Sequence, residues 1–266
     1  MKTYLGAISA CCVVALGGCA GVARTGAEIK SGAYEPRSNT AQSSPAERAR
    51  IHAELGALYL QEGRYSIALD EARVASASDP TYAPAYSVAG LVHMYLGEHA
   101  KAQASFDRAL ELAPDDPDIA NNFGWFLCQS GNERRSFEYF GRAARNPLYQ
   151  TPAKPRLNAG ICHFRLGNLK DALSSLREAL QYSPADLQVH FWLAQTLARL
   201  GDYSQARTHL GEIERRVELT AEALWLAVRV ERGLGNRDAE GRYGSQLRKR
   251  FPGSLEAAKL LRGESE

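Results

Sequence analysis

The feature that most constrains this chain is a glycine that recurs at a nearly constant interval. The intervals are 34, 34, 36, 34 and 34 residues between the successive members of the set Gly63, Gly97, Gly131, Gly167, Gly201 and Gly235. A sequence period of this length is the signature of stacked supersecondary units, each of which buries its apolar face against its neighbours. We therefore expect one continuous stack of repeats.

Two further positions in each unit carry small residues. The first set is Gly56, Gly90, Gly124, Gly160 and Ala194, and the second is Ala68, Ala102, Ser136, Ala172 and Ala206. Glycine inside a helix costs about 1 kcal/mol relative to alanine, so its recurrence at one position indicates close approach of two helices. With the period of 34 residues, this pattern resembles the tetratricopeptide repeat (TPR), a helix–turn–helix unit. The resemblance predicts an all-α fold, a right-handed superhelix of six repeats with a C-terminal capping helix.

The predicted repeats span residues 49–82, 83–116, 117–150, 153–186, 187–220 and 221–254. The two surplus residues fall at 146–155, where Pro147, Pro152 and Pro155 are expected to prevent helix and create an irregular joint. The sixth repeat is degenerate, with Glu240 at a normally small position. Residues 255–266 form the predicted cap and tail, which suits the end of a solenoid.

The amino terminus has the features of an export signal. Lys2 precedes an apolar stretch over residues 4–16, which is shorter than the roughly 20 residues that span a bilayer. The stretch ends in Leu16-Gly17-Gly18-Cys19, which resembles a bacterial lipoprotein signal. The resemblance implies a signal peptide over residues 1–18, and lipidation of Cys19 with acyl chains such as palmitate. Residues 19–48 would then be a lipidated N-terminus and flexible tether; the alternative is ordinary cleavage beside an incidental cysteine.

In TPR stacks the first helices of the repeats line a concave groove. By the family's geometry, the residues that face it are the second, fifth, sixth, ninth, twelfth and thirteenth of each first helix. Applied to repeats 2 to 6, these positions select Leu91, Met94, Tyr95, Asn121, Asn122, Trp125, Leu157, Asn158, Ile161, Phe164, Phe191, Trp192 and Trp225. An aromatic groove with amide groups fits an extended or helical protein segment. The alternative is that many of these side chains pack between repeats.

The cysteines give one more prediction. Cys128 and Cys162 remain after the signal and the lipidated residue are set aside, and both lie in first helices of adjacent repeats. Because the periplasm is oxidising, we predict a disulfide bond between them; the alternative is two small buried thiols.

Enzymatic chemistry is not indicated. The chain has no HExxH, CxxC, phosphate-loop or GxSxG motif, so we expect no enzyme activity, no metal and no cofactor. The 32 basic and 30 acidic residues leave a net charge of +2, too small to suggest a nucleic-acid partner. The sequence predicts a protein that binds other proteins.

Three stretches resemble one family, the type IV pilus biogenesis lipoproteins PilF and PilW, which act as pilotins. They are the lipoprotein signal ending at Cys19, the segment NNFGWFLC at 121–128, and the segment YGSQLRKRFPGS at 243–254. The resemblance implies a monomeric outer-membrane lipoprotein, facing the periplasm, that binds the pilus secretin and promotes its localisation and multimerisation. The alternative is a TPR adaptor that recruits peptidoglycan-remodelling enzymes.

Overall fold

The computed structural model describes residues 43–264, and this part of the chain contains thirteen α-helices and no strand. The predicted signal peptide, Cys19 and the predicted tether up to residue 42 lie outside the described residues. None of the helices within 43–264 combines the length and the apolarity needed to cross a membrane. The all-α solenoid predicted from the repeat pattern is confirmed.

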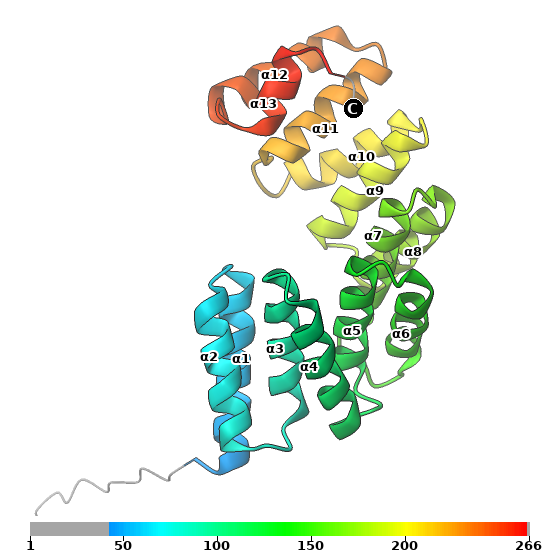
Figure 1. Cartoon of the computed structure of the whole chain (residues 1–266). Helices are drawn as coiled ribbons and strands as arrows, with labels where there is room; N and C mark the ends of the chain where they lie inside the picture. Colours follow the sequence, from blue (N-terminus) through cyan, green and yellow to red (C-terminus); the bar gives the residue numbers. More distant parts are fainter. Residues whose placement is uncertain (1–42, 265–266) are drawn as a thin grey trace, which may run out of the picture. The chain divides into compact units, whose positions relative to one another are not determined.

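Twelve of the helices form six hairpins that follow one another along the chain (Figure 1). The pairs are α1 (Pro45–Gln61) and α2 (Tyr65–Ser78), α3 (Ala83–Tyr95) and α4 (His99–Leu112), α5 (Pro117–Gln129) and α6 (Glu133–Arg145), α7 (Ala153–Arg165) and α8 (Leu169–Tyr182), α9 (Leu187–Arg199) and α10 (Tyr203–Glu214), and α11 (Ala221–Gly233) and α12 (Arg237–Arg250). The first helix of each hairpin also contacts the first helix of the next. The six first helices therefore form a continuous row.

Recurring glycines play two different roles in these hairpins. The six turn glycines have φ between 72° and 82°, and a Cβ added to any of them would meet nothing within 4 Å. Their role is the left-handed conformation that ends the first helix. Gly124 inside α5 is different, because a Cβ there would lie 2.9 Å from the ring of Phe140 on α6. Glycine at this position permits the two helices of the hairpin to approach.

Aromatic and aliphatic side chains connect neighbouring hairpins. Phe106 on α4 is fully buried, and its ring centroid lies 5.5 Å from that of Phe123 and 5.4 Å from that of Phe126, both on α5. A larger apolar cluster runs through α7 to α12 and includes Leu193 and Leu224. Burial between repeats therefore supplies the cohesion of the solenoid.

Two predicted boundaries differ from the structure. Helix α1 begins at Pro45, inside the range assigned to the tether, because the Ser44 hydroxyl accepts a hydrogen bond from the Glu47 amide and proline suits the first helical position. Helix α7 begins at Ala153, so Pro155 lies in its first turn, where proline is tolerated. The irregular joint is therefore shorter than predicted.

The connection between α6 and α7 is held by Tyr149. Its side chain is buried against Ala120 and Ala143, and its hydroxyl donates to Asp118 at 2.9 Å. The two surplus residues are thus absorbed in a packed loop. At the other end of the chain, α13 (Leu255–Leu261) packs against α11 and α12 and covers the sixth hairpin.

Candidate protein-binding groove

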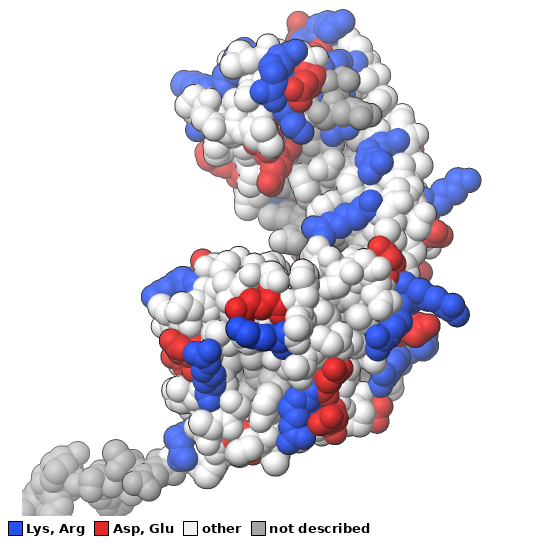
Figure 2. Space-filling model, in the orientation of Figure 1, with Lys and Arg blue, Asp and Glu red and all other residues white. Residues whose placement is uncertain are grey.

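The row of first helices carries an open groove of about 520 Å³. Its lining comes from the end of α1 and the start of α2, from the middle and end of α3, from the middle of α5, from the first nine residues of α7 and from the start of α9, so the groove crosses the helices diagonally. The residues that line it are Ala57, Leu60, Gln61, Gly63, Tyr65, Val88, Leu91, Tyr95, Asn122, Trp125, Lys154, Asn158, Ile161 and Gln188. In Figure 2 a hollow opens on this face of the molecule, and much of the surface beside it is uncharged.

A chain of side-chain amides links α3, α5 and α7, and two of its members, Asn122 and Asn158, line the groove. Asn158 on α7 donates to Asn121 on α5 at 3.0 Å, and Asn121 donates to Asn122 at 3.2 Å. Asn122 then donates to the Ser87 hydroxyl on α3 at 3.1 Å. These bonds fix the amide orientations, and they leave the Asn158 amide oxygen without a hydrogen-bonding partner in the described part of the chain. The groove therefore offers positioned polar atoms between apolar surfaces.

Stacked rings stabilise the apolar surfaces of the groove. Tyr65 and Tyr95 stack with ring centroids 5.7 Å apart, and Tyr95 remains 52% exposed. The Trp125 ring is covered on one side by the guanidinium of Arg165, 5.2 Å from its centroid. Such contacts restrict side-chain motion before a partner binds, which reduces the entropy lost on binding.

The groove carries little charge. Lys154 is the one ionisable amine or carboxyl group among the lining residues, and its Nζ lies 3.4 Å from an oxygen of Asp118. The same oxygen accepts the hydroxyl of Tyr149, whose pKa is raised chiefly by burial. Since Asp118 already neutralises Lys154, a binding partner does not need to supply a carboxylate to pair with this lysine.

The structure places the thirteen predicted groove residues in three different environments. Those that line the groove are Leu91, Tyr95, Asn122, Trp125, Asn158 and Ile161. Phe191 and Trp192 line a separate pocket, and Phe164 makes an edge contact with Trp192 at 5.4 Å. The prediction is wrong for the four residues that are buried and line neither site, which are Met94, Asn121, Leu157 and Trp225; Ile161 is also buried but still lines the groove.

Packing against neighbouring helices explains these four errors. Met94 belongs to the cluster around Phe106, while Leu157 and Trp225 belong to the large cluster of the last three hairpins. Asn121 has no exposed surface and acts by orienting the two asparagines beside it.

The first hairpin also contributes to the groove, although none of its residues was among those predicted. Ala57, Leu60 and Gln61 line the groove, and they occupy the ninth, twelfth and thirteenth positions of the predicted first helix of repeat 1. Val88, Lys154 and Gln188 were also missed; Val88 is sixth in its helix, and the other two are second in theirs. The same positional rule would have found these six residues, whereas Gly63 and Tyr65 lie beyond the end of α1, where the rule does not apply.

The two predicted cysteines are joined in the structure. Cys128 on α5 and Cys162 on α7 form a disulfide bond with their Cα atoms 6.1 Å apart, within the usual range for such bonds. The bond links first helices of adjacent hairpins, and neither cysteine lines the groove. It ties together the two repeats that flank the irregular joint.

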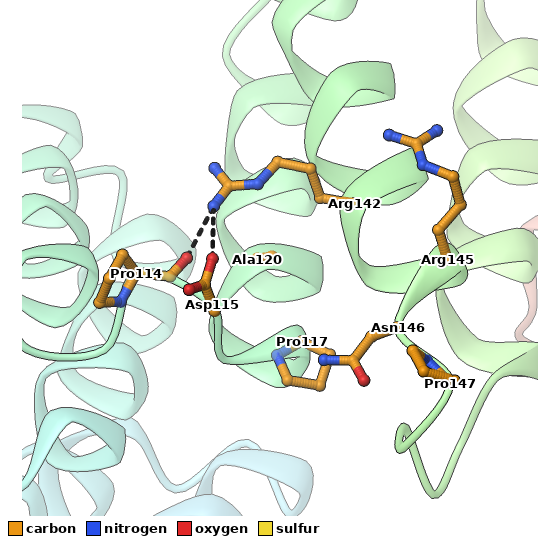
Figure 3. Close-up of a pocket in the computed structure, with 8 residues that line it drawn as sticks. All are labelled: Pro114, Asp115, Pro117, Ala120, Arg142, Arg145, Asn146 and Pro147. Atoms are coloured by element: carbon orange, nitrogen blue, oxygen red, sulfur yellow. Dashed lines mark hydrogen bonds and ion pairs between the residues drawn. The ribbon is translucent and has the colours of Figure 1, made fainter.

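A further pocket of about 400 Å³ lies between the loop before α5 and the end of α6 (Figure 3). There Arg142 donates to the carbonyl of Pro114 at 2.7 Å and lies 3.8 Å from a carboxylate oxygen of Asp115. It shares no residue with the groove. Because Arg142 is engaged by the loop, we interpret this contact as a brace between consecutive hairpins.

Within residues 43–264 no three or more His, Cys, Asp or Glu side chains are placed to hold a metal ion. Among the histidines, His52 pairs with Glu71 at 2.6 Å, and the two ring nitrogens of His190 lie 3.0 Å from His209 and from the carbonyl oxygen of Pro184. The groove and the row of helices that forms it define the class: a TPR protein that presents a concave surface to a partner.

Comparison with known proteins supports the assignment to the TPR proteins and identifies the family within them. Two family models, both described as tetratricopeptide repeat, match residues 83–116 and 163–226. The type IV pilus assembly protein PilF of Pseudomonas aeruginosa is 25% identical over 86% of this chain and 90% of its own.

Solved structures give the same result. The crystal structure of PilW, described as a widely conserved type IV pilus biogenesis factor, is 33% identical, with a TM-score of 0.72 over 80% of this chain and 98% of that one. The structure of Pseudomonas aeruginosa PilF shares the fold, with 24% identity and a TM-score of 0.69 over 83% of this chain and 99% of its own. The chain belongs to the PilF/PilW family of TPR proteins.

Proposed function

We propose that this protein acts in type IV pilus biogenesis as a lipid-anchored pilotin. In this role it binds a segment of the pilus secretin in its groove, brings the secretin to the outer membrane and promotes its assembly into multimers. Membership of the PilF/PilW family supports the pathway, and the sequence around Cys19 supports the lipid anchor. The observation that carries the proposal is a groove of low charge, lined by apolar rings and fixed amides, that crosses five consecutive first helices.

The physical reason lies in the nature of the client. A secretin subunit must cross the periplasm with apolar membrane-inserting surface, which would otherwise aggregate. Apolar groove side chains such as Trp125 and Leu91 can bury part of that surface, while the amides of Asn122 and Asn158 offer hydrogen bonds to the client's backbone. Acyl chains on Cys19 would keep the pair at the membrane, because more than one chain gives stable anchoring.

Substituting Trp125→Ala tests the groove. Because buried tryptophans are frequent hot spots worth about 2 kcal/mol or more, we expect about 30-fold weaker binding of purified secretin subunits. Tyr95→Ala is a second variant with less risk to folding, since Tyr95 is 52% exposed. Tyr182→Ala is the matched control, because Tyr182 is equally exposed but lies at the end of α8, outside the groove.

Secretin recovery at wild-type levels with both groove variants would contradict the proposal. Recovery of cell-wall hydrolases without secretin from detergent extracts would favour the adaptor alternative.

The anchor is tested by Cys19→Ser. We expect this variant to leave the outer-membrane fraction and the secretin to remain largely monomeric, as measured by membrane fractionation and gel analysis of unboiled samples. Normal secretin multimers in a strain that lacks the protein would refute the pilotin role.

A further inference from the structure

A second apolar pocket, of about 420 Å³, lies beside the groove at its far end. Its walls come from Leu187, Phe191 and Trp192 on α9 and from Ile213 and Val217 at the end of α10 and the loop that follows. Gln188 lines both this pocket and the groove. The two sites therefore adjoin at this residue, so one bound segment can extend from the groove into the pocket.

The aromatic walls of this pocket are held in place before anything binds. Phe191 and Trp192 meet edge to face with centroids 5.8 Å apart, and Trp192 meets Phe164 in the same way at 5.4 Å. Val217 on the opposite side is 45% exposed. A preformed pocket with apolar walls and one exposed aliphatic side chain suits a single large apolar side chain.

The rim of the pocket is acidic, unlike the groove. Glu218 and Glu222 both line it and are exposed, and Figure 2 shows acidic side chains over the connection between α10 and α11. Arg250 pairs with Glu218 at 2.8 Å, but the Glu218 side chain remains 86% exposed. Glu222 has no ion-pair partner within residues 43–264. It lies in the first turn of α11, where the positive end of the helix dipole offsets about half of its negative charge. Net negative charge therefore remains at the rim.

We propose that this pocket is a second recognition site, which binds a large apolar side chain that has a lysine or arginine within two residues of it. The apolar side chain fills the space between Trp192 and Val217, and the cation lies against Glu218 and Glu222. The identity of the client rests on the proposed function, whereas the chemistry of the site does not. Because the acidic rim is at one end of the path, such a site also fixes the direction in which a client lies along the groove.

The three tryptophans of the chain are built-in reporters for a test of this site. Trp125 lines the groove, Trp192 lines the second pocket, and Trp225 is buried in the core. The mature chain with ¹⁵N-labelled tryptophan is titrated by NMR with acetyl-Phe-Arg-amide up to about 10 mM, a range suited to a ligand of this size. Acetyl-Phe-Glu-amide and acetyl-Ala-Arg-amide are the comparison probes.

We expect the Trp192 indole resonance to move in a saturable way with the Phe-Arg probe, and the Trp225 resonance to stay in place. The Phe-Glu probe should bind about threefold more weakly, which is typical of an exposed charge pair, and the Ala-Arg probe should not saturate. The double variant Glu218→Gln, Glu222→Gln should bind the Phe-Arg probe no more tightly than the Phe-Glu probe, because Arg250 then has no counter-ion at the rim. Its unchanged Trp225 resonance would report an intact core.

Several outcomes would overturn the inference. They are no movement of Trp192 with the Phe-Arg probe, movement of Trp125 alone, or equal affinity of the wild-type chain for the Phe-Arg and Phe-Glu probes. Failure of secretin binding with normal probe binding would refute the proposed function and leave the second site intact. Failure of probe binding while Trp125→Ala still abolishes secretin binding would refute the second site alone.

Discussion

Reduction of the disulfide between Cys128 and Cys162 should destabilise the solenoid by a predictable amount. The bond closes a loop with a sequence separation of 34 residues. The entropy removed from the unfolded chain by a loop of this length corresponds to about 4 kcal/mol at 25 °C. With an m-value of about 2–3 kcal/mol per M, the urea midpoint of the reduced protein should be lower by roughly 1.3–2 M.

The reduced wild-type protein is the sharpest comparison, because reduction breaks the bond without replacing any side chain. Cys162 is fully buried, with its sulfur 3.8 Å from the Ser136 hydroxyl, a polar neighbour for the thiol. Urea unfolding followed by circular dichroism, with and without reductant, measures the difference. The double variant Cys128→Ala, Cys162→Ala controls for other effects of the reductant and should not respond to it.

The position of the bond predicts where the loss appears. In a solenoid each repeat contacts only its neighbours, so stability is lost locally. Hydrogen exchange should accelerate most in α5 to α8, on the two sides of the irregular joint. An unchanged urea midpoint on reduction, or faster exchange confined to the terminal hairpins, would refute this reasoning.

Two further predictions concern glycine packing and histidine ionisation. Gly124→Ala should lower the free energy of unfolding by about 1–3 kcal/mol, because the added Cβ would lie 2.9 Å from the Phe140 ring. Gly241→Ala should instead raise the free energy of unfolding by up to about 1 kcal/mol, because an added Cβ there meets nothing within 4 Å and alanine favours the helix. Burial, and then the neighbouring His190, hold the pKa of His209 below its usual value of 6.5. The unfolded chain therefore binds a proton more readily, so this residue's contribution to stability is present above pH 6.5 and is lost as the pH falls below it. His209→Gln should flatten the dependence of the urea midpoint on pH between about 7.5 and 5.5.

Each of these predictions has a clear contrary result. Equal urea midpoints for the two glycine variants would show that the contact with Phe140 relaxes without cost. A His209→Gln profile that still falls as steeply on acidification as the wild type would contradict the assigned role of burial.

Much of the site could be predicted because position in a repeat is a local property. The rule that selected Leu91, Tyr95 and Trp125 needs only the start of each first helix, and the hairpin geometry repeats. The same rule failed for Met94 and Trp225, which are buried between repeats. The residue pattern of a single helix cannot tell a side chain that faces the groove from one that packs against the neighbouring hairpin, since both lie on the same side of the helix.

The sequence by itself determined the repeat number, the turn positions and the pairing of helices, because these depend on short-range backbone geometry and on which residues can continue a helix. Only the tertiary structure decided that the groove runs diagonally, from Leu60 and Gln61 near the end of α1 to Gln188 near the start of α9. It alone separated Phe191 and Trp192 into a second pocket. The physical reason is that the offset between successive hairpins is set by side-chain packing between repeats, and this offset decides which turn of each helix remains open to a partner.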